Sequence, residues 1–395
     1  MTPTTDAPGP EPVDSWLLSE GRRSETPGKM LTALCERLVR LGLPLDRASL
    51  HVSTLHPQVR GTRFLWRRDG GPVADVHYER TDSAIDAAYQ TSPLFVVHQT
   101  GQRVRRRLEG PAVLDDFPIL AELRGEGLTD YLAVPLVFSS GPLQVATWSS
   151  GRPGGFSEAD VAQIEALLPA LAAASEAHEQ RRMLQTLLET YLGRQAGRRV
   201  LDGTIARGDG ETIAAALWYC DLRGFTAMSD ALPRDEVIAL LNDYFECMAG
   251  PVHDKGGEVL KFIGDALLAI FPIVDDLDRD PACRTALAAA EEALADLGRL
   301  NVGRRGSGRP ALEVGIGLHT GAVMYGNIGA PDRLDFTIIG PAVNMVTRIE
   351  DLCPVLERTL LTSSRFASPC GSKLVSLGLH QLKGIAARQE LFGLP

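Results

Sequence analysis

The stretch that decides the fold is GEVLKFIGDALLAIF, residues 257–271. Two apolar segments flank Gly264-Asp265, and a short glycine-containing turn between apolar runs is typical of a β-hairpin. A second buried-strand pattern, AAALWYC at 214–220, stops abruptly at Asp221. If a strand over 213–220 neighbours the hairpin, the strand spacing of about 4.8 Å brings Asp221 and Asp265 together.

Two carboxylates held together require a cation, and hard oxygen ligands favour Mg²⁺ or Mn²⁺. Two such ions about 4 Å apart can activate an attacking hydroxyl and neutralise a leaving phosphate. Each aspartate alone would be explained by a structural role, Asp265 as a turn residue and Asp221 as a helix-capping residue. The presence of both favours a metal site. The segment RGFT at 223–226 follows Asp221 and leads into a helix, where its backbone amides could hold a polyphosphate.

A third motif spans GIGLHTG at 315–321, GNIG at 326–329 and DFTIIGPAVNMVTRIE at 335–350. Gly340-Pro341 indicates a helix start, because proline is tolerated in the first turn. Asn344 and Arg348 are four residues apart and so share one helix face, where they could hold a ribose and a phosphate. His319 follows an apolar strand and has no evident partner, so we favour a structural role for it over that of a general base.

The elements of this region alternate along the chain. We expect a strand at 213–220, a helix at 233–249, the hairpin at 257–271, a helix at 281–299, strands at 311–318 and 334–339, and a helix at 342–352. This order predicts an α+β domain in which a mixed sheet carries helices on one face, as in ferredoxin-like folds.

With these motifs, residues 212–395 resemble the catalytic domain of the class III adenylate and guanylate cyclases. The resemblance implies that Asp221, Asp265 and the Leu222 carbonyl bind two Mg²⁺ or Mn²⁺ ions per active site. It also implies substrate-binding and transition-state residues, which are the purine readers Lys261 and Thr337, the phosphate-loop residues Phe225 and Thr226, the triphosphate-binding Lys383 in QLKG, and the transition-state pair Asn344 and Arg348.

The two purine readers favour ATP. Lysine can donate to adenine N1, whereas guanine N1 carries a proton and prefers an acidic partner. Thr337 departs from the aspartate of many adenylate cyclases, but its hydroxyl can accept from the adenine 6-amino group. Threonine is the variant of the bicarbonate-responsive branch, which makes bicarbonate a candidate activator. Pro341-Ala342 also replaces a common polar pair, which should affect packing more than catalysis.

The predicted activity is that of an adenylate cyclase, in which the ribose 3′-oxygen of ATP attacks the α-phosphorus to give 3′,5′-cyclic AMP and pyrophosphate. By the resemblance, one catalytic domain supplies the metal aspartates and a second supplies Lys261, Thr337, Asn344 and Arg348, so the active form is a homodimer. A guanylate cyclase is the first alternative, disfavoured by Lys261. A catalytically inactive nucleotide-binding or regulatory module is the second, disfavoured because every matched catalytic residue is present.

The region before this domain has a different pattern. Residues 1–28 are rich in Pro, Thr, Ser, Gly and charge, which predicts a disordered or loosely attached tail. Residues 29–178 predict a helix at 30–41, strands at 48–55, 62–66, 73–78, 131–138 and 143–149, and a long helix from Ser157. The last strands and the helix that follows resemble the end of a GAF-like sensory domain, and this resemblance covers about residues 29–178.

The GAF-like resemblance implies regulation of catalysis by a small-molecule effector that the sequence does not identify. His98, Cys35 and Trp66 are candidate contacts, although isolated residues of these types more often belong to the core or surface. Helical periodicity resumes through Met183 and Leu188, which predicts a helical linker or transducer over 179–211.

Bulk composition excludes several classes of protein. The 395 residues suffice for two or three domains, and the net charge of −10 argues against a nucleic-acid binder. The six cysteines lack paired spacings, as in a protein with reduced thiols. No apolar run approaches the roughly 20 residues that span a bilayer, and the start lacks a signal-peptide core. We therefore expect a cytoplasmic protein without a transmembrane segment.

Overall fold

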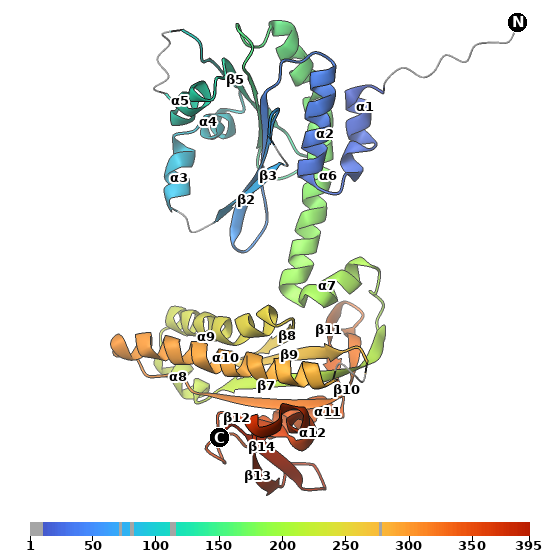
Figure 1. Cartoon of the computed structure of the whole chain (residues 1–395), viewed down its shortest axis with the longest axis vertical. Helices are drawn as coiled ribbons and strands as arrows, with labels where there is room; N and C mark the ends of the chain where they lie inside the picture. The colour runs from blue at the N-terminus through green and yellow to red at the C-terminus, as the bar shows by residue number, and fades with distance from the viewer. Residues whose placement is uncertain (1–10, 71–72, 80–82, 111–115, 276–278) are drawn as a thin grey trace, which may run out of the picture. The chain divides into compact units, whose positions relative to one another are not determined.

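A computed structural model describes residues 11–70, 73–79, 83–110, 116–275 and 279–395. The chain divides into two compact units, Met1–Leu187 and Leu188–Pro395, whose elements are labelled in Figure 1. Helix α6, Glu158–Leu192, begins in the first unit and ends in the second. The expected boundaries after residues 178 and 211 remain predictions.

The first unit is a six-stranded antiparallel sheet with strand order β3-β2-β1-β6-β5-β4. Helices α1, α2 and α6 lie on one side of this sheet, and α3, α4 and α5 lie on the other (Figure 1). The helices are α1 Val13–Leu18, α2 Pro27–Arg40, α3 Ser83–Gln90, α4 Pro93–Thr100 and α5 Pro118–Gly125, and the strands are β1 Arg47–Ser53, β2 Val59–Arg67, β3 Ala74–Glu79, β4 Val104–Arg107, β5 Asp130–Leu136 and β6 Gln144–Ser150. The expected strands and first helix are confirmed to within about three residues.

The prediction of a loose tail over residues 1–28 is wrong for its second part. Residues 13–28 form α1, a 3₁₀ turn at Gly21–Arg23 and the start of α2. Trp16 is 3% exposed and Leu17 fully buried in the core between the sheet and α2. His178 of α6 also contacts the Gly21 carbonyl at 3.1 Å. The polar average over 28 residues hid one short apolar segment, and residues 1–10 lie outside the described part of the chain.

The second unit is built on an eight-stranded sheet with order β13-β14-β12-β10-β7-β9-β8, and β11 pairs with β10. Helices α9 and α10 lie side by side along one face (Figure 1). The strands are β7 Gly210–Leu222, β8 Glu258–Ile263, β9 Ala266–Ile273, β10 Val314–Ala330, β11 Arg333–Ile339, β12 Leu360–Ser363, β13 Val375–His380 and β14 Gln389–Gly393, and the helices are α7 Arg194–Leu201, α8 Phe225–Ala231, α9 Arg234–Asp254, α10 Arg279–Gly306, α11 Pro341–Glu350 and α12 Ser364–Ala367.

Strand β7 is central, and both of its faces are buried. Ala216, Trp218 and Cys220 pack in the core under α9 and α10, while Ala215 and Leu217 face a second core. Helix α11 and Ala196 of α7 cover that second face, so the expectation of helices on one face alone is wrong. Burial on both faces explains why β7 is continuously apolar rather than alternating.

Strand β10 is far longer than the expected 311–318. It runs from Val314 to Ala330 and pairs with β7 along the whole length of β7. Its glycines admit α11, because a Cβ at Gly317 would lie 2.6 Å from the Val346 carbonyl oxygen and one at Gly321 2.7 Å from the Ala342 Cβ. These glycines therefore serve close packing and do not end the strand.

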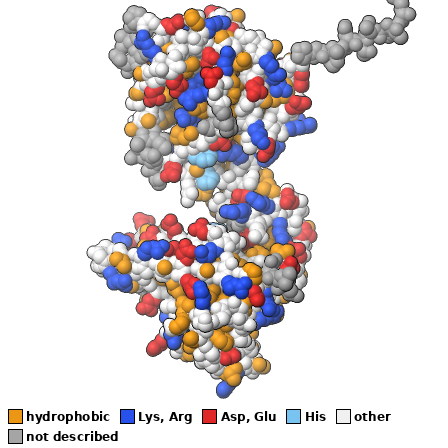
Figure 2. All heavy atoms as spheres, viewed as in Figure 1, with side chains coloured by type: hydrophobic (Ala, Val, Ile, Leu, Met, Phe, Trp, Pro, Cys, Tyr) orange, Lys and Arg blue, Asp and Glu red, His pale blue; other side chains and the backbone are white. Residues whose placement is uncertain are grey.

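Acidic and basic side chains are intermingled over the visible face of each unit (Figure 2). In the described part of the chain, every helix is too short or too polar to cross a membrane.

Candidate active site

The two predicted metal aspartates meet at one end of the sheet. Strand β7 pairs antiparallel with β9, with Cys220 opposite Leu267, so the expectation that β7 neighbours the hairpin is confirmed. Asp221 follows Cys220 on β7, and Asp265 lies in the turn between β8 and β9. Gly264 adopts a φ of 64° in this turn, a value that favours glycine.

The two carboxyl groups interact directly. Burial, followed by a hydrogen bond with Asp265 and the negative charge of Asp265, raises the pKa of Asp221 to about 6. The Oδ1 atom of Asp221 is buried and has no hydrogen-bond partner among the described residues. A buried oxygen without a donor is costly, and so is the repulsion between two neighbouring carboxylates. A cation bound here would offset both.

A third acid, Glu350 at the end of α11, was missed by sequence reasoning. It is 6% exposed, and its Oε1 would lie 2.0 Å from a Cβ at Gly315, the residue opposite Asp221 in the β7–β10 ladder. Burial and the charge of Asp221 raise the pKa of Glu350 to about 7. Glycine at 315 is the one sequence signal for this approach, because any side chain there would displace Glu350.

The oxygen atoms at this end of the sheet suit hard divalent cations. Asp221 and Asp265 supply carboxylate oxygens, and Leu222 lies next to Asp221 at the end of β7. Within the described ranges no group of three or more His, Cys, Asp or Glu side chains is arranged to hold a metal. A site here would thus rest on two carboxylates, backbone oxygen and substrate, as suits Mg²⁺.

The predicted purine reader Lys261 lies on β8, and Thr337 lies on β11. Lys261 Nζ donates to Asp335 Oδ2 at 2.5 Å, and this bond lowers the pKa of Asp335. Asp335 and Thr337 are two residues apart on β11 and therefore share one face of the strand. The structure thus brings Lys261 to the strand that carries Thr337, through a contact with Asp335 that the sequence reasoning did not anticipate.

Asn344 and Arg348 lie on α11, with Asn344 exposed. Arg348 Nη1 donates to Asp351 Oδ2 at 2.9 Å, on the exposed side of the helix. Among the described residues, no hydrogen bond or ion pair joins Asn344 or Arg348 to Asp221 or Asp265.

The remaining substrate-binding candidates lie at the start of α8 and between β13 and β14. Thr226 is exposed and Phe225 is half-buried against the core at the start of α8, after Gly224 with a φ of 69°. Lys383 is exposed in the segment between β13 and β14. His319 does have a partner, since its Nδ1 lies 2.7 Å from the Ser363 hydroxyl oxygen. Burial lowers the pKa of His319 to about 4, in keeping with a structural role.

A buried carboxylate also ties α7 to the hairpin. Glu258, at the start of β8, is 3% exposed and accepts hydrogen bonds from the backbone amides of Gln195 and Ala196 at 3.0 and 3.2 Å. The Tyr325 hydroxyl donates to its other oxygen at 3.0 Å. Burial raises the pKa of Glu258, whereas the donors oppose this rise. These hydrogen bonds fix the N-terminus of α7 to Glu258, which precedes Lys261 by three residues on β8.

Comparisons with known proteins find relatives of the second unit. Residues 211–370 match the family model of the adenylate and guanylate cyclase catalytic domain. The chain is 38% identical over 147 residues to an adenylate cyclase of Anabaena cylindrica, which covers 37% of this chain and 28% of that protein. It is 30% identical over 178 residues to adenylate cyclase 1 of Rhizobium meliloti, covering 44% of this chain and 26% of that protein.

The matched part of the chain thus spans about a quarter of the length of these relatives. A solved adenylyl cyclase from P. aeruginosa aligns with a TM-score of 0.43 at 25% identity, covering 47% of this chain and 95% of that chain. The family match over 211–370 contains the part of β7 that carries Asp221, the hairpin that carries Lys261 and Asp265, and the helix that carries Asn344 and Arg348. The chain therefore carries, over residues 211–370, a catalytic domain of the class III adenylate and guanylate cyclase family.

Proposed function

We propose that this chain is an adenylate cyclase that converts ATP to 3′,5′-cyclic AMP and pyrophosphate at a site shared by two copies of the chain. The observation that carries the proposal is the paired carboxyls of Asp221 and Asp265, with one buried oxygen lacking a donor. Such a pair at the end of a central strand is suited to cations that bind a polyphosphate.

Two Mg²⁺ or Mn²⁺ ions would be held by Asp221, Asp265 and the Leu222 carbonyl. When bound, these ions supply Lewis-acid activation of the ribose 3′-hydroxyl and neutralise charge on the leaving pyrophosphate. The protein's own contribution is to hold the two carboxylates on adjoining β elements, which need no rearrangement when substrate arrives. Glu350 adds negative potential beside Asp221 without joining it as a ligand in our proposal.

The purine would be read by Lys261 and Thr337. The Lys261 ammonium donates to adenine N1, and its ion pair with Asp335 fixes its position. The Thr337 hydroxyl accepts from the 6-amino group. Lys383, Phe225 and Thr226 would contact the triphosphate, and activation by bicarbonate stays a prediction.

A shared site is what the resemblance to the class III cyclases implies. Asn344 would orient the ribose, and Arg348 would stabilise charge at the α-phosphoryl group, both acting on substrate held by the aspartates of the other copy. Exposed apolar side chains support an association surface: Phe262 and Ile263 on β8 are 51% and 49% exposed, and Met324 and Ile339 lie opposite each other on β10 and β11. Such side chains favour burial against a partner.

The first unit would regulate this activity as a GAF-like sensory domain. Helix α6 is continuous from Glu158 to Leu192, and α7 follows after Gly193 and is fixed to β8 through Glu258. A change in α6 would therefore reach the strand that carries Lys261 through contacts within the second unit. Regulation of this kind requires an effector that binds two states unequally.

The choice between ATP and GTP is tested by reversing the charge at position 261. We expect the wild-type chain to turn over ATP at least about tenfold faster than GTP, and Lys261→Glu to lose at least about tenfold in kcat/KM for ATP while its relative use of GTP rises. Lys373→Glu, on an exposed lysine paired with Glu291, makes the same charge change elsewhere and should keep the preference. A wild-type chain that prefers GTP would contradict the adenylate assignment.

A further inference from the structure

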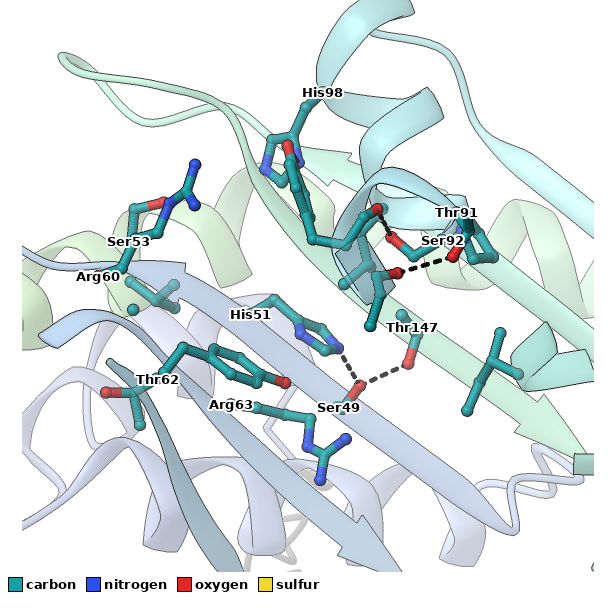
Figure 3. A pocket seen from close by; sticks show the side chains of 18 of the residues that line it. Ser49, His51, Ser53, Arg60, Thr62, Arg63, Thr91, Ser92, His98 and Thr147 are labelled. Carbon is teal, nitrogen blue, oxygen red and sulfur yellow. Dashed lines mark hydrogen bonds between the residues drawn. The ribbon is translucent and has the colours of Figure 1, made fainter. Parts of the chain in front are cut away.

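The first unit contains a cavity of about 770 Å³ between its sheet and the helical side formed by α3, α4 and α5 (Figure 3). Alternation along β1 creates its floor: Ala48 and Leu50 pack into the core under α2, while Arg47, Ser49 and His51 face the cavity. A volume of this size lies in the range of small-molecule sites.

The neighbouring strands extend the polar floor. Arg63 of β2 lies opposite His51, and Thr147 of β6 lies opposite Ser49. The Ser49 hydroxyl is 2.6 Å from that of Thr147 and 2.9 Å from His51 Nε2, which are the dashed contacts at the centre of Figure 3. Three adjacent strands therefore present one connected polar surface to the cavity.

This surface carries positive charge that the protein compensates only in part. Arg47 is 8% exposed, and its Nε is buried without a hydrogen-bond partner; its nearest carboxylate contact is Glu126, with Arg47 Nε 3.9 Å from Glu126 Oε2. The Nε of Arg63 is also buried without a hydrogen-bond partner, and in the part of the chain that the structure describes no carboxylate forms an ion pair with Arg63.

The other groups at the cavity do not remove this charge. Among the described lining residues, the charged side chains are Arg47, Arg60, Arg63 and a single acid, the exposed Glu122. Burial, together with the charges of Arg63 and Arg47, lowers the pKa of His51 to about 3, so its imidazole is neutral and can exchange hydrogen bonds with a ligand. A buried donor without an acceptor is costly, and a buried charge more so.

We propose that this cavity binds a small organic anion, with its carboxylate or phosphate between Arg47 and Arg63 and its apolar body against the helical side. The guanidinium groups of Arg47 and Arg63, which both line the cavity, would donate to the oxyanion. Charge-assisted bonds of this kind are about twice as strong as neutral ones. Leu94 and Ile119 line the helical side of the cavity, and Leu143 lines it from the segment before β6, so together they offer apolar surface to the rest of the ligand. Binding at this cavity does not depend on the proposed cyclase activity, because it is measured without turnover.

The test uses two fluorescent probes that differ by one oxyanion. The full chain is titrated with 8-anilinonaphthalene-1-sulfonate and with its neutral counterpart N-phenyl-1-naphthylamine. We expect one saturable sulfonate site per chain, filled at least about tenfold more tightly than by the neutral probe. Competition by 1-naphthyl phosphate and by 1-naphthoate then separates a phosphate ligand from a carboxylate ligand, and displacement by either supports the proposal.

Two variants make the result specific to the cavity. Arg63→Gln should weaken sulfonate binding at least about tenfold, leave the neutral probe unchanged, and not lower the unfolding temperature, because it removes a buried charge that lacks a partner. Arg103→Gln, on an exposed arginine paired with Glu165 and outside the cavity, should change neither probe. Equal affinity of the two probes for the wild-type chain, or unchanged sulfonate affinity in Arg63→Gln, would overturn the proposal.

Discussion

Replacing Asp221 or Asp265 by alanine is expected to reduce cyclic AMP formation at least about 100-fold, with Mg²⁺ and with Mn²⁺ alike. Each change removes one of the two carboxylates that would hold the ions. The remaining carboxylate cannot supply the same negative charge, so metal binding is lost. Initial rates of cyclic AMP release from ATP, measured at saturating metal, give the comparison. Retention of more than about a tenth of wild-type activity in Mn²⁺ would contradict the two-metal assignment.

Unfolding should not account for that loss. Burial and the neighbouring Asp265 raise the pKa of Asp221 in the folded chain to about 6, above its unfolded value. A raised carboxyl pKa means that the ionised group disfavours the metal-free fold at pH above about 6, so Asp221→Ala should unfold at the same or a higher temperature at pH 7.5. Asp243→Ala, on an exposed aspartate of α9, is the matched control and should keep wild-type activity.

Mixing two inactive variants should restore activity. In Asp221→Ala chains the metal pair is broken, and in Arg348→Ala chains the transition-state arginine is missing, but a dimer of one chain of each kind contains one intact shared site. With random exchange between equal amounts, half of the dimers are mixed and each has one working site of two, so we expect about a quarter of wild-type activity per chain.

The control for this experiment places both changes in the same half of the site. Asp221→Ala mixed with Asp265→Ala gives dimers in which every site lacks one aspartate, so activity should stay at background. Native mass spectrometry measures the fraction of mixed dimers in each sample. Mixed Asp221→Ala and Arg348→Ala dimers that form yet remain inactive would contradict a site built from two chains.

Local sequence patterns predicted the centre of the candidate site well. The apolar run that ends at Asp221 and the hairpin around Gly264-Asp265 each encode a strand and its end, and pairing of β7 with β9 then follows from their shared burial. Helix α11 was equally evident, because Gly340-Pro341 starts it and its apolar positions recur at helical spacing. These features depend on residues that are close in sequence.

Features that depend on distant contacts were not predictable in the same way. The strand expected over 311–318 continues to Ala330, and the glycines at 317 and 321 admit α11, whose approach no local pattern reveals. Asp335 gains its role only because β8 and β11 meet, and Glu350 only because α11 ends beside Asp221. The positive cavity of the first unit likewise depends on arginines that lie on two different strands.

The central claim is most directly tested by the products that the full chain makes from ATP. With Mg²⁺ or Mn²⁺ present, we expect 3′,5′-cyclic AMP and pyrophosphate in equal amounts, and none after the metal is removed by chelation. Mass spectrometry identifies the cyclic product, and a coupled pyrophosphate assay gives the ratio. A dimeric preparation that yields no cyclic AMP with either metal, or that releases ADP and phosphate in its place, would contradict the account.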